Sequence, residues 1–180
     1  MHHHYQTEQW LPFPVDRVFA FFADPGNLPR LMPEWQKVRI DALHSVPPLD
    51  EAGMEARTAN ARPGKAAGAG SSIVLSFRPI PLLPLRLSWV ARITEFTANE
   101  GFCDEQERGP FAYWRHCHAT RVEVRGGVAG TAVRDDLEYE IPLGRAGDMA
   151  HALVRRQIEG LFAYRQRRLP ELLWDNDSRS

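Results

Sequence analysis

The feature that most constrains the fold is a change of hydrophobic period near residue 147 of this 180-residue chain. Upstream, four consecutive segments alternate apolar and polar residues with period two, which is typical of β-strands. They are Arg86–Phe96, Phe102–Glu107, Ala112–Val124 and Thr131–Ile141. From about Gly147 to Leu173, apolar residues recur every three or four positions, as on one helix face. Strands followed by one long amphipathic helix predict an α+β fold, with the helix packed on an antiparallel sheet.

The N-terminal half adds shorter elements. The spacing favours a strand at His4–Leu11, a helix at Val15–Ala23 with Pro14 at its first turn, and a short helix at Leu28–Leu31 that ends before Pro33. Further strands are predicted at Lys37–Leu43, Met54–Ala59 and Ile73–Phe77. Asn60–Ser72 is rich in Gly, Ala and Ser, which predicts a mobile loop inside the domain. We give His2–His4 no functional role and expect residues 175–180 to fray.

Together these elements predict one domain over residues 1–180 with a helix-grip fold. A curved antiparallel sheet would wrap around the long C-terminal helix, and two short helices would follow the first strand. A strongly curved sheet does not fill its own interior easily, so we expect a cavity between the sheet and the helix.

Composition excludes several classes of partner. The formal net charge is -1, so there is no general basic field to attract nucleic acid. No apolar run reaches the roughly 18 residues of a membrane span, and the N-terminus lacks an apolar signal core. We therefore expect a cytoplasmic protein whose two cysteines, Cys103 and Cys117, are reduced.

Three motifs resemble one family. Asn27–Trp35 contains an Asn-Leu pair before a Pro-x-Trp, and Asp104–His116 reads D-x-Q-x-x-G-P-x-x-x-W-x-H. Further on come Thr131, Asp135, Tyr139 and Pro142. Over roughly residues 5–172 the chain resembles the START and birch-pollen-allergen (SRPBCC) superfamily, in particular a bacterial branch of ligand-binding proteins. The resemblance implies the helix-grip fold and a ligand cavity. It does not choose among lipid carriers, hormone receptors, polyketide cyclases and oxygenase subunits.

Strand alternation places an unusually polar set of residues on the inner sheet face. Trp114, His116 and His118 share one face, which continues to Val122 and Val124 and therefore reads as the inner one. Neighbouring strands add Asp104 and Gln106, and Asp135 and Tyr139. Three interpretations remain open: a structural hydrogen-bonded network, the polar end of a ligand pocket, or a catalytic His–Asp pair.

The turn at Gly109-Pro110 makes the flanking strands an antiparallel pair. Same-face residues must oppose each other, and we predict Phe102 opposite His118 and Asp104 opposite His116. A two-residue slip would keep the face but set Asp104 opposite His118 or Trp114. Cys103 and Cys117 would then oppose each other on the outer face. The nearby carboxylate should raise the pKa of His116.

The favoured function is non-enzymatic binding of a small hydrophobic or amphipathic molecule. The expected ligand-binding residues are Phe19, Phe22, Trp35, Phe77, Trp89, Phe102, Gln106, Trp114, His116, His118, Leu137, Tyr139, Ile158, Leu161 and Phe162. The alternative is a polyketide-type cyclase, aromatase or dehydratase, with His116 as base and Asp104 or Asp135 as its orienting partner. A third hypothesis is an interaction module that docks through the apolar Pro79–Leu85 loop.

Two further expectations concern the polar residues. No cofactor and no metal are expected, although His116 and His118 with Asp104 or Asp135 could supply three metal ligands. Arg165 falls near the apolar stripe of the long helix and could reach an inner carboxylate. The sequence does not indicate an oligomeric state.

Overall fold

The computed structural model describes residues 1–48, 66–81, 83–142, 144 and 149–177. Its elements are β1 (His2–Leu11), α1 (Val15–Ala23), the 3-10 helices η1 (Pro25–Leu31) and η2 (Glu34–Gln36), β2 (Arg39–His44), β3 (Ser72–Phe77), β4 (Leu87–Thr97), β5 (Gly101–Arg108), β6 (Tyr113–Arg125), β7 (Val128–Glu140) and α3 (His151–Asp177). This order confirms the predicted α+β arrangement. The predicted strand Met54–Ala59 and residues 60–65 of the predicted loop lie outside the described residues.

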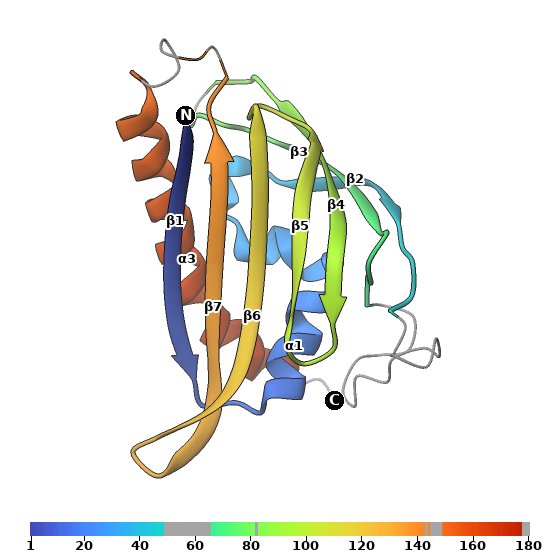
Figure 1. The fold of residues 1–180 in the computed structure, drawn as a ribbon, viewed down its shortest axis with the longest axis vertical. Coiled ribbons are helices and arrows are strands. Elements are labelled where there is room, and N and C mark those ends of the chain that lie inside the picture. The colour runs from blue at the N-terminus through green and yellow to red at the C-terminus, as the bar shows by residue number, and fades with distance from the viewer. Residues whose placement is uncertain (49–65, 82, 143, 145–148, 178–180) are drawn as a thin grey trace.

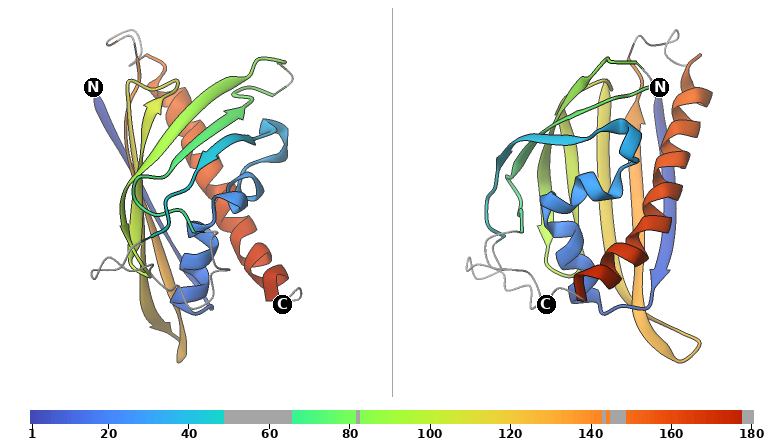
Figure 2. Two further views of the ribbon diagram at one scale, coloured as in Figure 1. Left: turned by 90° about the vertical axis from the view of Figure 1, so that its right-hand side faces the viewer. Right: turned by 180° about the vertical axis from the view of Figure 1, so that it is seen from behind.

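The strands form one seven-stranded antiparallel sheet in the order β1-β7-β6-β5-β4-β3-β2. The sheet curves around α3, which crosses its concave side with α1 and η1 beside it (Figures 1 and 2). This is the helix-grip fold. Within the described part of the chain, no helix carries an apolar stretch long enough to cross a bilayer.

Two hydrophobic clusters attach α3 to one side of the sheet. The C-terminal half of α3 contributes Leu169, Leu172 and Leu173 to a cluster that contains residues of β1, α1, η1 and β7. The N-terminal half places Ile158 and Phe162 against residues of β7. The interior beyond these clusters, toward β3, β4 and β5, is where the cavity lies.

The predicted register of β5 and β6 is confirmed. Phe102 pairs with His118, Cys103 with Cys117 and Asp104 with His116. Pairing of β6 with β7 then sets His118 opposite Asp135. These two registers bring one carboxylate from each neighbouring strand to the histidines of β6.

The expectation of reduced cysteines is wrong for this structure, because Cys103 and Cys117 form a disulfide. Their Cα atoms are 4.1 Å apart, since directly opposed residues of an antiparallel ladder leave the same face side by side. The two cysteines are opposed as predicted, but they are linked and not free.

Two further expectations need correction. Val122 and Val124 continue the inner face of β6 but are 65% and 63% exposed, because the β6–β7 hairpin extends beyond the covered part of the sheet (Figure 1). The end of the predicted mobile loop is also packed. Ala66 and Ala67 are buried, and the Ala67 amide donates to the Ala23 carbonyl at 3.0 Å.

Candidate functional site

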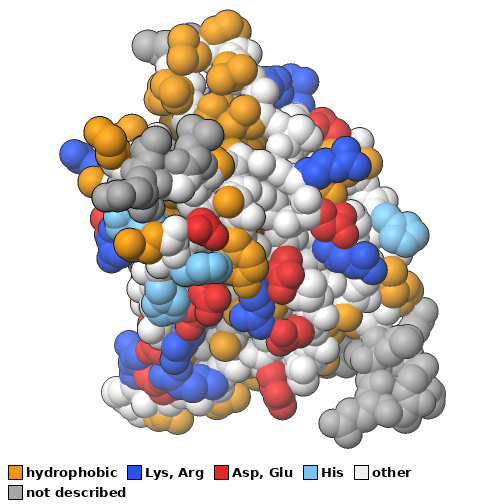
Figure 3. Space-filling model, turned by 45° about the horizontal axis from the view of Figure 1, so that its top comes forward, with side chains coloured by type: hydrophobic (Ala, Val, Ile, Leu, Met, Phe, Trp, Pro, Cys, Tyr) orange, Lys and Arg blue, Asp and Glu red, His pale blue; other side chains and the backbone are white. Residues whose placement is uncertain are grey.

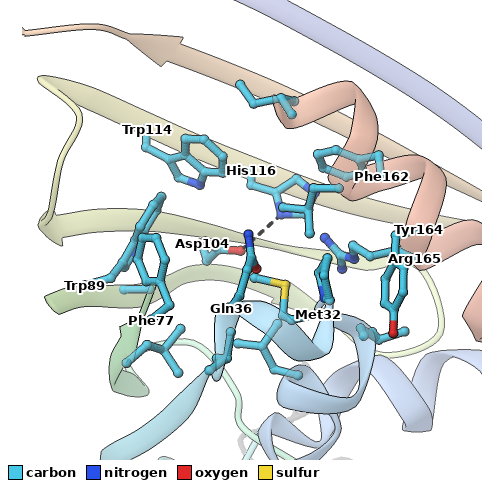
Figure 4. Close-up of a pocket in the computed structure, with 18 of the residues that line it drawn as sticks. Met32, Gln36, Phe77, Trp89, Asp104, Trp114, His116, Phe162, Tyr164 and Arg165 are labelled. Atoms are coloured by element: carbon cyan, nitrogen blue, oxygen red, sulfur yellow. Dashed lines mark ion pairs between the residues drawn. The ribbon is translucent and has the colours of Figure 1, made fainter. Parts of the chain in front are cut away.

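A cavity of about 990 Å³ lies between α3, strands β3 to β6 and the η1–η2 segment. Most of its wall is aromatic or aliphatic, and Figure 4 shows aromatic side chains facing it from the sheet and from α3. Eleven of the residues expected to bind a ligand line it: Phe22, Trp35, Phe77, Trp89, Phe102, Trp114, His116, His118, Ile158, Leu161 and Phe162.

Four expected residues lie outside the cavity lining. Phe19 is buried in a cluster with α1 and β5 neighbours, and Leu137 and Tyr139 are fully buried against α3. Gln106 holds the β5–β6 turn instead: its Nε2 donates to the Phe111 carbonyl at 2.7 Å, and its Oε1 accepts from the Phe111 amide at 3.3 Å. Alternation gives the face that a strand residue occupies, but not whether packing or open space covers it.

Much of the opposite wall was not predicted as a site. It comes from the η1–η2 region and from α3, and includes Leu28, Met32, Gln36, Val38, Tyr164 and Arg165. The 3-10 segments are too short to show a hydrophobic period, so the sequence carried no signal for them. Arg165 had a signal, because it lies near the apolar stripe of the helix.

The polar residues form a connected group at one part of the wall. The Nδ1 atom of His116 lies 3.6 Å from Oδ1 of Asp104, and its Nε2 lies 3.1 Å from Oδ1 of Asp135 (Figure 4 shows the first contact). The same Asp135 oxygen is 2.6 Å from Nδ1 of His118, a short contact poorly aligned with the ring N–H. Nη2 of Arg165 lies 3.5 Å from Nε2 of His118.

The surroundings of the two histidines shift their pKa values in opposite directions. Burial alone would lower the pKa of His116, but Asp104 and Asp135 together outweigh it and the pKa is raised, as predicted. Burial, and then the charge of His116, lower the pKa of His118 to about 4. Burial would raise the pKa of Asp135, yet the histidines and Arg165 hold it well below its ordinary value. His116 is thus the favoured cation, and His118 is neutral at neutral pH.

The contact with Arg165 favours one tautomer of His118. An arginine side chain can only donate, so the contact favours an Nε2 atom that accepts and a ring proton on Nδ1, the nitrogen nearer Asp135. His116, His118 and Asp135 present ligand atoms within 4.8 Å of one another, close enough to hold a metal ion. A metal on Nδ1 of His118 would place a proton on Nε2, against the Arg165 donor. The arrangement therefore suits hydrogen bonding better, and the absence of a metal stays a prediction.

The structure also locates Arg165 and the Pro79–Leu85 loop. Arg165 meets a histidine and not the inner carboxylate that the sequence suggested. In the Pro79–Leu85 loop, Pro79 lines the cavity while Ile80, Leu83 and Leu85 are exposed. Figure 3 shows hydrophobic side chains gathered at one end of the molecule.

Known proteins share this architecture. No functionally curated protein matches the chain. Among solved structures, TTHA0849 from Thermus thermophilus is 16% identical, with a TM-score of 0.62 over 97% of this chain and 99% of that one. Ara h 8.0201 is 13% identical, with a TM-score of 0.55 over 94% and 98%. These identities support the fold alone. The family model "Polyketide cyclase / dehydrase and lipid transport" matches residues 11–163, so the chain belongs to that family.

Proposed function

We propose that this protein binds a small hydrophobic or amphipathic molecule in the cavity. The observation that carries the proposal is the cavity itself, about 990 Å³ with mainly apolar walls and one polar group of residues. Ligand pockets typically measure roughly 300–1,000 Å³ and combine apolar walls with a few convergent polar groups. The lipid-transport part of the family description agrees with a carrier or sensor of such a molecule.

A cavity-filling substitution tests the proposal. Ala91 is a small buried residue of β4 in the cavity wall, so Ala91→Phe would place a ring in the space that a ligand needs. Ala119→Phe is the matched control, because Ala119 is exposed on β6 and outside the lining. We expect the fluorescent probe 1-anilinonaphthalene-8-sulfonate to bind wild type and the control but not Ala91→Phe.

Cooperative urea unfolding of all three proteins must accompany the titration, because this probe also binds loosely packed states. Equal probe binding by Ala91→Phe and wild type would contradict the proposal. So would the absence of any bound probe in wild type, together with no co-purified small molecule in native mass spectrometry.

A second candidate function is a polyketide-type cyclase, aromatase or dehydratase. It is favoured by His116, a cavity-wall residue held between Asp104 and Asp135 with a raised pKa. The protonated ring is suited to act as a general acid, for example toward a leaving hydroxyl, rather than as the base expected from sequence. The carboxylates would stabilise its charge and orient it.

The enzyme hypothesis has a separate test. A panel of β-hydroxycarbonyl compounds would be assayed with wild type, His116→Gln and His118→Gln. We expect turnover to fall as the pH rises through the pKa of His116, and to be lost in His116→Gln but retained in His118→Gln. If His116→Gln binds the 1-anilinonaphthalene-8-sulfonate probe and turns over at the wild-type rate, His116 is not the general acid. If wild type binds the probe but turns over no compound of the panel, the enzyme hypothesis fails and the binding function stands.

A further inference from the structure

Arg165 is a cation in the cavity wall that contacts no carboxylate in the part of the chain that the structure describes. Its polar partner there is the neutral His118, at 3.5 Å, and its guanidinium carbon lies 5.2 Å from the centre of the Phe162 ring. A guanidinium has five N–H donors, of which the His118 contact uses one. Figure 4 shows the side chain reaching from α3 into the cavity.

The nearby carboxylates are already engaged with histidines. Asp104 pairs with His116, and Asp135 contacts both His116 and His118. Arg165 influences Asp135 only at longer range, as one of several charges that lower its pKa. The guanidinium therefore keeps donors directed to the cavity. When an apolar ligand displaces water there, those donors need a new acceptor, because an unpaired buried charge is costly.

We propose that the ligand carries a carboxylate that Arg165 binds, while its apolar body lies along the aromatic wall formed by Phe77, Trp89 and Trp114. This inference rests on the binding function proposed above. The planar guanidinium matches a carboxylate in geometry, with two parallel N–H···O bonds. A dianion such as phosphate fits less well, because Asp104 and Asp135 lie near the same place. The centre of the Trp89 ring is 6.2 Å from the centre of the Phe77 ring and 4.8 Å from the centre of a Trp114 ring. The three side chains thus give the apolar body a continuous surface.

The test compares two probes that share one apolar body and differ in whether the head group is a charged carboxylate or a neutral methyl ester. The fluorescent 11-(dansylamino)undecanoic acid and its methyl ester would be titrated into wild type, Arg165→Met, Arg165→Lys and Arg156→Met at neutral pH. Arg156→Met is the matched control, since Arg156 is an exposed arginine of the same helix outside the cavity lining. Far-UV circular dichroism would verify that each variant folds.

We expect wild type and Arg156→Met to bind the acid about tenfold or more tightly than the ester, because a charge-assisted hydrogen bond contributes at least that much. Arg165→Met should bind acid and ester equally, and Arg165→Lys should retain part of the preference. Equal binding of acid and ester by wild type would overturn the inference and leave the binding function intact. A preference that survives in Arg165→Met would do the same. If wild type binds neither probe, the inference falls together with the proposed function.

Discussion

From the buried environment of His118 we predict how the free energy of unfolding changes with pH. The ring is 6% exposed and packs against Phe22 and Phe102, each with its ring centre 4.9 Å away. Burial and the neighbouring His116 charge lower its pKa from 6.5 to about 4. Below pH 6.5 the unfolded chain takes up a proton at this residue, whereas the folded protein does so only near pH 4. Acidification across this window therefore favours unfolding.

The magnitude follows from the two pKa values. Between about pH 7.5 and about pH 5, His118 should reduce the free energy of unfolding by about 2 kcal/mol. His116 acts in the opposite sense: its raised pKa contributes stability that is complete below pH 6.5 and is lost as the pH rises through the folded value. The net curve of wild type mixes both effects, so a variant is needed to isolate His118.

The variant is His118→Gln, whose amide can face Asp135 and Arg165 but does not titrate. We expect the difference in free energy of unfolding between wild type and His118→Gln to shift by about 2 kcal/mol in favour of the variant between about pH 7.5 and about pH 5. Urea denaturation at each pH measures it. The control is His44→Gln, the same substitution at an exposed histidine of β2 outside the cavity lining. A difference between wild type and His118→Gln that does not change with pH would refute the reasoning.

Three further substitutions test what stabilises the fold. Phe162→Ala should lower the free energy of unfolding by about 3–5 kcal/mol, because the ring is only 2% exposed; a loss under about 1 kcal/mol in urea denaturation would contradict its place in the core. Gly160→Ala should stabilise α3 by about 0.5–1 kcal/mol, since a Cβ there meets nothing within 4 Å, and a lowered melting temperature would contradict this. Under non-reducing conditions, Cys117→Ser should lower the free energy of unfolding by roughly 3 kcal/mol, because the linked residues are separated by 14 positions in sequence. Adding reductant should destabilise wild type but have no further effect on this variant.

The sequence predicted the site best where short-range geometry determines it. The Gly109-Pro110 turn predicted an antiparallel pair, and alternation fixed the face of each side chain, because a one-residue slip would reverse it. The structure then sets Asp104 opposite His116, as predicted, and not in the same-face register two residues away. The recurrence of apolar residues every three or four positions likewise predicted the long helix, which the structure places at His151–Asp177.

The sequence did not reveal how deeply each inner-face residue is buried, or which distant segments complete the cavity wall. Tyr139 and Val122 lie on inner faces, yet one is fully buried beneath α3 and the other projects beyond it. Alternation does not distinguish them, because burial depends on where the helix crosses the sheet. The cavity wall around Met32 and Gln36 comes from 3-10 turns without periodicity. Arg165 could be assigned to the cavity only after the tilt of α3 was known.

The disulfide has a consequence for the interior. Cys103–Cys117 and Asp104–His116 are successive pairs of one ladder, the first directed outward and the second inward. Sliding of β5 along β6, which would offer His116 a different neighbour, requires the covalent link behind it to open. The Asp104–His116 pair is thus restrained by a disulfide on the outer face of the sheet, and this link takes no volume from the cavity. Ligand-facing side chains of β5 and β6 can therefore be substituted without loosening the pairing of these two strands.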